Sequence, residues 1–173
     1  MLFLLGLPRG EVFLIPWTSE WEKEFLAEKR KIENLIGNHI LAIHHIGSTS
    51  VPYLSAKPII DMAIEINKFD EGLDCISGLE MLGYKYRGTA VLPERHYFNK
   101  GEPRTHQIHM YESGNKYLVE QIQFRNYLRT NEAARLEYEK LKQKLSQKNP
   151  NDKHQYAEDK TNFVMSILKS LDI

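Results

Sequence analysis

The chain has 173 residues, a length that fits one ordinary domain over residues 1–173 better than two independent cores. Hydrophobic residues make up 42% and charged residues 27%, which is typical of a folded globular protein and excludes a disordered chain. Lys plus Arg and Asp plus Glu both number 23, so no overall field draws the protein to nucleic acid or to an anionic membrane. We therefore expect neither as a partner.

The N-terminus and the cysteine content bear on location. Met1–Leu7 is apolar but too short to span a membrane, and it lacks the basic start of a secretory signal, so we expect an edge strand or an ordered tail there. Cys75 is the only cysteine, which excludes an internal disulfide and Cys-rich zinc modules. Both observations favour a cytoplasmic protein.

The first half of the chain alternates between helical and extended patterns. Ser19 and Glu22 have capping-box spacing before apolar residues at helical intervals, and Gly37 suits the left-handed position that ends such a helix. Ser50 is a good N-cap for a short helix. The predicted elements are the helix from Ser19 to Gly37, a strand over Ile40–Ile46, the short helix near Val51–Leu54, and a strand over Ile59–Ile66.

The second half begins with extended patterns and ends in helices. A helix through Leu73–Leu82 closes at Gly83, and weaker strand patterns follow over Tyr84–Arg87, Val91–Asn99 and Thr105–Tyr111. Helices are predicted over Leu118–Arg129, over Asn131–Ser146, and from Pro150 to about Leu171. The fold class is therefore α/β (α+β): a mixed sheet flanked by helices, with a helical C-terminal third.

A phosphate site is the strongest chemical signal in the sequence. Gly47-Ser48-Thr49-Ser50 follows a predicted strand, and a glycine turn with hydroxyls and free N–H groups can hold a phosphate. Alone, the pattern is more often a serine-capped turn. Asp61 begins the next strand and Lys57 precedes it, and phosphate donors, a carboxylate and a cation together can hold a metal–nucleotide complex.

Longer motifs resemble the GrpB family, which is assigned to the nucleotidyltransferase superfamily. The matching segments cover nearly the whole chain: Ile15–Trp17 with Trp21, His45–Pro52, Ala56–Asp61, Arg95–Phe98, Arg104–His109, Phe124–Arg129, and Tyr156 with Lys160. The resemblance implies a nucleotidyltransferase-like fold, and it implies much less about activity. Gln107 and Asn126 stand where this family commonly has histidine and aspartate.

One departure concerns the metal. Working nucleotidyltransferases usually carry two acids separated by one residue, but here Asp61 is followed by Met62 and Ala63. Alternate strand residues share a face, so Ala63 occupies the place of the second acid, and Glu65 lies about 13 Å along the strand from Asp61. Two-metal phosphoryl transfer needs carboxylates that bridge ions about 4 Å apart. Asp61 is left as the single expected ligand for Mg²⁺.

Histidines offer a further polar group. On the predicted strand Thr105–Tyr111, His109 points with Gln107 and Tyr111, and His106 points the other way. His109 is the better candidate for a catalytic role beside Asp61, if Ile108 and Met110 face the core. A zinc site made from the histidines at 44, 45, 106 and 109 is disfavoured because adjacent strand residues face oppositely.

Three further cations are candidates for phosphate binding. Arg125 and Arg129 stand four apart on a helix and share one face, so they form either a fork for phosphate or a pair of surface charges that meet glutamates. Lys160 falls on the apolar stripe of the last helix, so its tip either reaches the pocket, snorkels to solvent, or pairs with a glutamate.

Two functions remain open at this point, ahead of a third, a metal-dependent hydrolase, that rests only on the histidines. The first is a nucleotidyltransferase-like protein that binds a nucleotide or another phosphate-bearing small molecule and transfers a nucleotidyl or phosphoryl group with Mg²⁺. The second is a non-catalytic ligand-binding or partner-regulating module that has lost the two-metal site. A second acid close to Asp61 in the folded protein would favour the first function, because two-metal transfer needs it.

Overall fold

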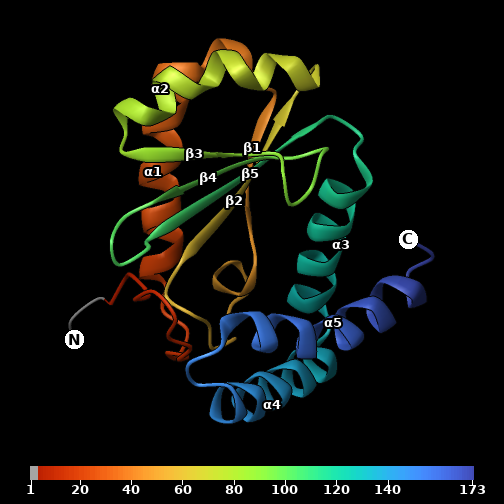
Figure 1. Cartoon of the computed structure of the whole chain (residues 1–173). Coiled ribbons are helices and arrows are strands. Elements are labelled where there is room, and N and C mark those ends of the chain that lie inside the picture. The colour runs from red at the N-terminus through yellow and green to blue at the C-terminus, as the bar shows by residue number, and fades with distance from the viewer. Residues whose placement is uncertain (1–3) are drawn as a thin grey trace.

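The computed structural model describes residues 4–173, and within them five strands form one sheet (Figure 1). The strand order is β1-β2-β5-β4-β3, with β2 and β5 parallel and the other neighbours antiparallel. The strands are β1 (Ala42–Ile46), β2 (Ile60–Ile66), β3 (Tyr84–Gly88), β4 (His96–Lys100) and β5 (His106–Glu112). The predicted mixed sheet is confirmed.

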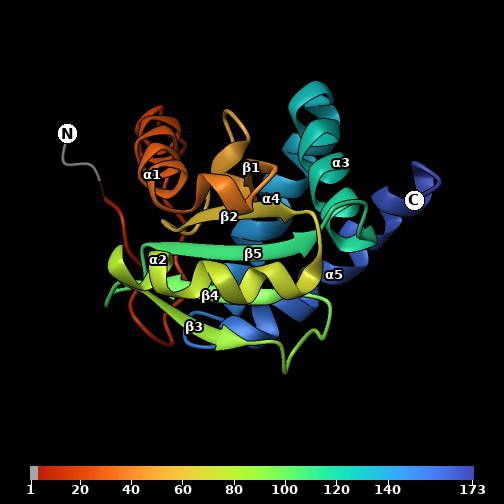
Figure 2. The same ribbon diagram turned by 90° about the horizontal axis from the view of Figure 1, so that it is seen from above.

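The largest core lies between one face of the sheet and two helices. Helices α1 (Glu20–Ile36) and α2 (Ile76–Met81) cover this face (Figure 2). Trp21 and Ile32 of α1 pack in the same cluster as Met62, Ile64 and Ile108 of the strands. Because alternate strand residues face oppositely, Asp61 on β2 and His109 on β5 point to the other face.

The last third of the described chain is helical, as predicted. It consists of α3 (Lys116–Thr130), α4 (Glu132–Lys148) and α5 (Lys153–Ser170), which lie beside and below the sheet in Figure 1. Asn115, Asn131 and Asp152 cap their N-termini, each accepting a hydrogen bond from a backbone N–H. No helix among the described residues is long and apolar enough to cross a membrane.

Local details differ from the sequence predictions. Ser19 precedes α1, but its side chain makes no capping bond, and Gly37 has φ −54° because a 3₁₀ turn over Gly37–His39 continues the chain. The predicted short helix near Val51–Leu54 is wrong: a single 3₁₀ turn over Ser48–Ser50 takes its place, since Val51 is already extended. A 3₁₀ segment over Phe69–Cys75 precedes α2.

Two predicted strands also differ from the structure in where they begin or how far they extend. The strand predicted from Val91 begins at His96, and residues 91–95 form a turn before it. In the N-terminal segment, Leu7 makes one antiparallel bridge to Arg104, so the edge-strand expectation holds at that residue. The part of that expectation that falls on residues 1–3 lies outside the described residues.

Candidate functional site

The loop Gly47–Ser50 and Asp61 meet at the end of two neighbouring strands. β1 and β2 run antiparallel with Ile46 opposite Asp61, so the residue after β1 lies against the Asp61 carboxylate. Gly47 has φ +73°, and a Cβ at this position would lie 2.9 Å from Asp61 Oδ2. Only glycine fits both the backbone conformation and the close approach. The predicted neighbourhood of loop and carboxylate is confirmed.

Two side chains of β5 donate to Asp61. Gln107 Nε2 donates to Asp61 Oδ1 over 3.0 Å, and His109 Nε2 lies 3.4 Å from the same oxygen. His109 Nδ1 lies 3.2 Å from Nη1 of Arg95, which can only donate, so a neutral His109 carries its proton on Nε2 and donates it to Asp61. The predicted side of the strand for His109 is correct, because Ile108 and Met110 are buried in the core.

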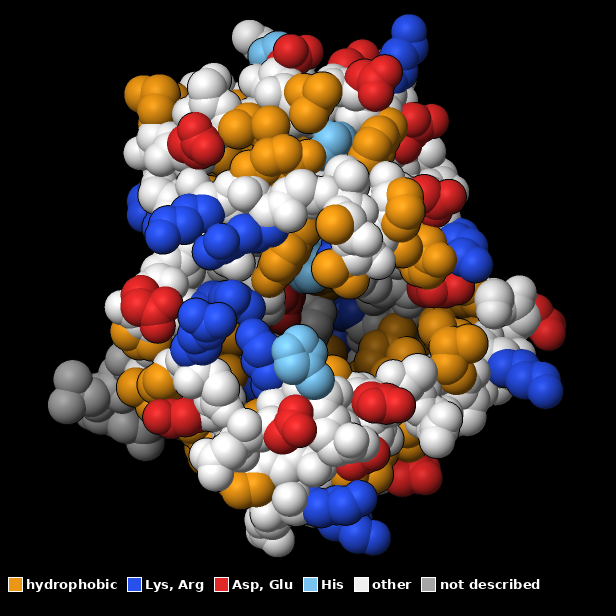
Figure 3. Space-filling model, in the orientation of Figure 1, with side chains coloured by type: hydrophobic (Ala, Val, Ile, Leu, Met, Phe, Trp, Pro, Cys, Tyr) orange, Lys and Arg blue, Asp and Glu red, His pale blue; other side chains and the backbone are white. Residues whose placement is uncertain are grey.

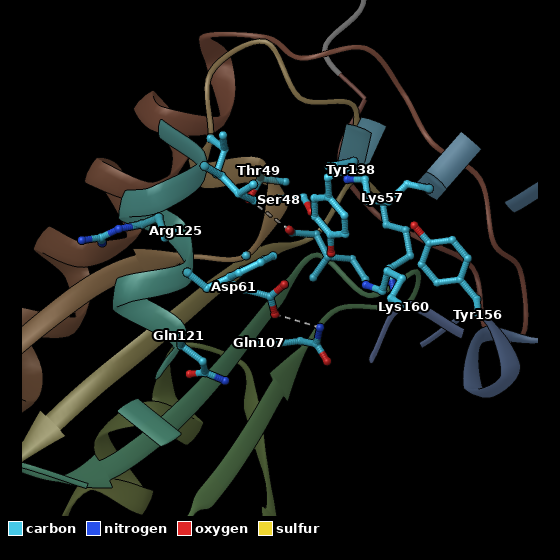
Figure 4. Close-up of a pocket in the computed structure, with 17 residues that line it drawn as sticks. Ser48, Thr49, Lys57, Asp61, Gln107, Gln121, Arg125, Tyr138, Tyr156 and Lys160 are labelled. Carbon is cyan, nitrogen blue, oxygen red and sulfur yellow. Dashed lines mark hydrogen bonds between the residues drawn. The ribbon is translucent and has the colours of Figure 1, made fainter. Parts of the chain in front are cut away.

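A cavity of about 140 Å³ begins at this junction. It lies between the sheet and the C-terminal helices, where the molecule is visibly hollowed in Figure 3. Figure 4 shows Ser48 and Asp61 on one side of the cavity, and Lys57, Tyr138, Tyr156 and Lys160 on the other. Strand, loop and helix residues that are far apart in sequence thus surround one space.

Three lysines converge on the cavity. Lys57 and Lys160 lie against the ring of Tyr156, with Nζ 5.2 and 4.9 Å from its centroid, and Lys142 Nζ lies 5.2 Å from the centroid of Tyr138. Across residues 4–173, none of the three ammonium groups has a carboxylate oxygen within 4 Å. The aromatic faces offer only part of the missing stabilisation.

Burial lowers the pKa values of all three lysines. Burial, together with the charge of Lys160, lowers the pKa of Lys57 to about 8. Burial also lowers the pKa of Lys160, against the attraction of Asp61, and it lowers the pKa of Lys142 well below the usual value. A negatively charged ligand would reverse these shifts because it favours the charged form.

The hydroxyls of the loop divide into two groups. Thr49 and Ser50 are buried: the Thr49 hydroxyl bonds to Ile59 O and to His45 Nε2, while Ser50 donates to Gly47 O. Ser50 is absent from the residues that line the cavity. Their side chains therefore hold the loop. Ser48 lines the cavity and is only partly buried, which makes it the hydroxyl open to a ligand.

Arg125 and Arg129, expected to form either a phosphate fork or surface pairs with glutamates, both donate to backbone carbonyls in this structure. Arg125 Nη1 donates to His45 O over 2.9 Å, and Arg129 Nε donates to Ser50 O over 2.9 Å. The two arginines therefore bind one carbonyl just before the Gly47–Ser50 loop and one at its end, and neither forms a salt bridge within the described chain. Arg125 borders the cavity with its guanidinium turned away from it (Figure 4), and Arg129 does not line it.

The residues around Asp61 do not fit a two-ion centre. Asp61 is the only carboxylate among the described residues that line the cavity, and Ala63 is fully buried where a second acid would stand. Gln107 and His109 both present N–H groups to Asp61 Oδ1, and N–H donors cannot serve as metal ligands. One carboxylate oxygen, Oδ2, is left for a cation, which is too little to bridge a pair of ions.

The histidines considered for a zinc site lie on different faces of the sheet. His45 and His106 are buried on the helix-covered face, whereas His109 lies on the other. Over residues 4–173, one group of His, Cys, Asp and Glu side chains is close enough to hold a metal ion: Glu24, Glu28 and His106. Lys100 and Lys31 already neutralise Glu28, so this group is an ion-pair cluster.

Sequence reasoning missed Lys142 and the two tyrosines, Tyr138 and Tyr156, as cavity residues. Lys142 is 1% exposed, and its Nζ donates to the carbonyl of Ser55. The signal was available, because positions 134, 138, 141, 142 and 145 follow the helical repeat and place Lys142 on the buried stripe of α4. The same repeat places Lys160 on the apolar stripe of α5.

The sequence profile of a family described as "GrpB protein" matches residues 11–170. The chain belongs to the GrpB family. Curated relatives include "Glutamate-rich protein GrpB" of Alkalihalophilus pseudofirmus, 32% identical over 97% of this chain and all of that one. "UPF0157 protein YqkA" of Bacillus subtilis is 37% identical over 91% of this chain, which spans 46% of that relative's length.

Solved structures agree with this assignment. The conserved protein GrpB from Enterococcus faecalis matches with a TM-score of 0.86 and 34% identity over 91% of this chain and 96% of that one. The poly(U) polymerase Cid1, solved with MgGTP bound, matches with a TM-score of 0.53 and 11% identity over 77% of this chain and 44% of that one. The GrpB chain therefore has the predicted nucleotidyltransferase-like fold.

Proposed function

We propose that this GrpB protein binds the phosphate groups of a small molecule in the lysine-lined cavity, and that a nucleoside triphosphate is the ligand class to test first. The observation that carries the proposal is the set of three ammonium groups, Lys57, Lys142 and Lys160, around a cavity with one carboxylate. Lys142 is buried and Lys57 and Lys160 are half-buried, and holding cations there without a counter-charge is costly, so the site is suited to an anion.

The remaining lining supports a ligand with an uncharged part. Val51, Phe124 and Leu128 form an apolar side of the cavity, and Ser48 offers a hydroxyl at the end near Asp61. Small-molecule sites commonly combine apolar walls with a few polar groups that fix orientation. The choice of nucleotides as first probes rests on the fold shared with Cid1, which was solved with a nucleotide bound.

Binding is better supported than two-metal group transfer. Phosphoryl or nucleotidyl transfer through two ions needs a second carboxylate near Asp61, and the cavity has none among the described residues. The lysines themselves can neutralise phosphate charge. The proposal therefore requires phosphate affinity that does not depend on Mg²⁺.

Asp61→Asn provides the test, because it separates a metal ligand from a nearby negative charge. We expect titration calorimetry to show that the common nucleoside triphosphates bind the wild type without Mg²⁺. The variant should bind them as tightly or several-fold more tightly, because a like charge is removed. A tenfold loss that occurs only with Mg²⁺ present would assign Asp61 to a metal instead. Absence of binding by every nucleotide would overturn the proposal.

A further inference from the structure

A second hollow, of about 720 Å³, adjoins the cavity on the same face of the sheet. Lys57, Ile59 and Gln107 border both spaces, so the Asp61–Gln107 pair lies in the wall between them. We call this hollow the arginine groove. Its six cations come from separate segments of the chain and are Arg9, Lys57, Arg87, Arg95, Arg104 and Lys153.

Among the described residues, the cations of the arginine groove far outnumber the carboxylates beside them. Glu102 is the one carboxylate that lines it in the described chain, against six cations. None of the six forms a salt bridge within residues 4–173. Figure 3 shows Lys and Arg side chains gathered beside the central hollow, between the sheet and the C-terminal helices.

This concentration of charge contrasts with the sequence as a whole. The chain carries 23 basic and 23 acidic residues, so the excess in the groove is local. Burial lowers the pKa of Lys153, and the charges of Arg104 and Arg9 lower it further, which means that the cations repel one another across the groove. Such a surface focuses a field that attracts anions and needs counterions to be stable.

The side chains at the wall are already oriented. Gln107 Oε1 accepts a hydrogen bond from the Tyr97 hydroxyl and lies 3.5 Å from Arg104 Nη1, while its Nε2 donates to Asp61. Arg87 Nε donates to Asn99 Oδ1 over 3.1 Å, so its remaining guanidinium N–H groups are free to bind a ligand. A guanidinium fixed in this way suits phosphate oxygens, which it contacts in pairs.

The size and lining of the groove favour a small molecule over a polymer. Its volume falls within the range of small-molecule pockets, about 300–1,000 Å³. Single-stranded nucleic acids are held by aromatic rings on which bases stack. Tyr97 is the one Phe, Tyr or Trp that lines the groove in the described chain, and Arg95 and His109 already cover its ring, at 4.9 and 5.4 Å.

We propose that the arginine groove is a second binding site, for a small molecule that carries several phosphates, placed back to back with the lysine cavity across Asp61 and Gln107. This inference goes beyond the proposed function and does not require it, since the two spaces share only Lys57 among their lining cations. If both sites are filled, two phosphate-bearing molecules approach each other at Asp61.

The test uses inorganic tripolyphosphate as the probe and a triple variant, R9Q/R87Q/K153Q, that removes cations at the rim of the groove. Arg9 and Arg87 are exposed and Lys153 is partly exposed, so the fold should be retained. The matched control, K68Q/K144Q/K169Q, removes three exposed charges that line neither space. Circular dichroism and thermal melting check that both variants fold.

We expect calorimetry to show that the groove variant loses one tripolyphosphate site, or weakens it by about tenfold for each lost contact, while the control binds like the wild type. If the cavity fails to bind nucleotides but the groove variant still loses a site, the groove inference stands and the proposed function falls. Equal site number and affinity in the groove variant and the control would overturn the inference. Tighter, groove-dependent binding of a short single-stranded oligonucleotide would overturn the choice of a small molecule.

Discussion

Two buried polar regions lie on opposite faces of the sheet, and they differ in whether their charges are paired. On the face covered by α1, Glu28 lies 2.6 Å from Lys100, 3.2 Å from Lys31 and 2.9 Å from the Tyr84 hydroxyl. On the other face, Lys57, Lys142 and Lys160 surround a cavity without a carboxylate within 4 Å of their ammonium groups in the described chain. The charges of the first region are paired, whereas the second region lacks an anion.

The pKa shifts express the same difference. Burial opposes ionisation of Glu28, but the hydrogen bond from Lys100 and the charges around it lower the pKa of Glu28 overall. In the cavity, the effect of burial outweighs the attraction of nearby carboxylates such as Asp61, and the lysine pKa values are lowered. A buried charge with partners has a structural role, whereas buried charges without partners indicate a place for a ligand.

The largest expected effect comes from breaking the paired region. Glu28→Gln should lower the free energy of unfolding by about 3 kcal/mol, because it leaves the ammonium of Lys100 and the hydroxyl of Tyr84 without their carboxylate. Urea unfolding measures this, with Glu33→Gln as the control, since Glu33 is exposed and lies 3.8 Å from Lys29. The control should change by less than about 0.5 kcal/mol. Equal effects in the two variants would contradict the structural role of Glu28.

In the cavity, we expect a substitution to change the free energy of unfolding in the opposite direction. Lys142→Met should raise the free energy of unfolding by about 1 kcal/mol, since the gain from removing a buried unpaired charge exceeds the loss of the hydrogen bond to Ser55. Nucleotide affinity should fall at least about tenfold. Lys144→Met, at an exposed position, is the control. A variant that is both less stable and equally able to bind would show that Lys142 is a structural residue.

Substitution of Lys160, on the last helix, provides another test of the cavity. Lys160→Met keeps the apolar stem against Tyr156 but removes the charge, so the melting temperature should change little. Affinity for a nucleoside triphosphate should fall by about tenfold. Calorimetry would compare it with Lys169→Met, an exposed lysine on the same helix. Normal binding by Lys160→Met would remove Lys160 from the site.

The smallest expected effect is a pH dependence from Lys57. Its pKa in the folded protein is lowered to about 8 from 10.5, so below pH 8 the free protein carries the charge that a phosphate needs. Affinity for a triphosphate should fall by up to about tenfold per pH unit above pH 8. Stability shows the opposite trend: the cost of charging buried Lys57 is fully present below pH 8 and is relieved as the pH rises toward 10.5.

The measurement is a calorimetric titration at several pH values, repeated with Lys57→Met. This variant should bind more weakly at neutral pH and should lose the decline in affinity near pH 8. A wild-type affinity that stays constant through this range would show that Lys57 does not contact the ligand.

Much of the candidate site could be predicted because it is local in sequence. Gly47, Ser48 and Asp61 lie on or beside two strands that are consecutive in the chain, and the side of β5 on which His109 lies follows from strand alternation. The helical positions of Lys160 and Lys142 likewise follow from their repeat. Which hydroxyl stays free, Ser48 or Ser50, could not be predicted, because both have the same chemistry in the sequence.

The sequence by itself determined the mixed sheet, the helical last third, the family and the missing second acid at Ala63, since each depends on periodicity or on residue identity along the chain. Only the tertiary structure decided that Arg125 and Arg129 clamp the loop, that Gln107 donates to Asp61, and that six cations form one groove. Those facts depend on distances between segments far apart in sequence. Local patterns carry no information about such distances, because packing fixes them only when the elements assemble.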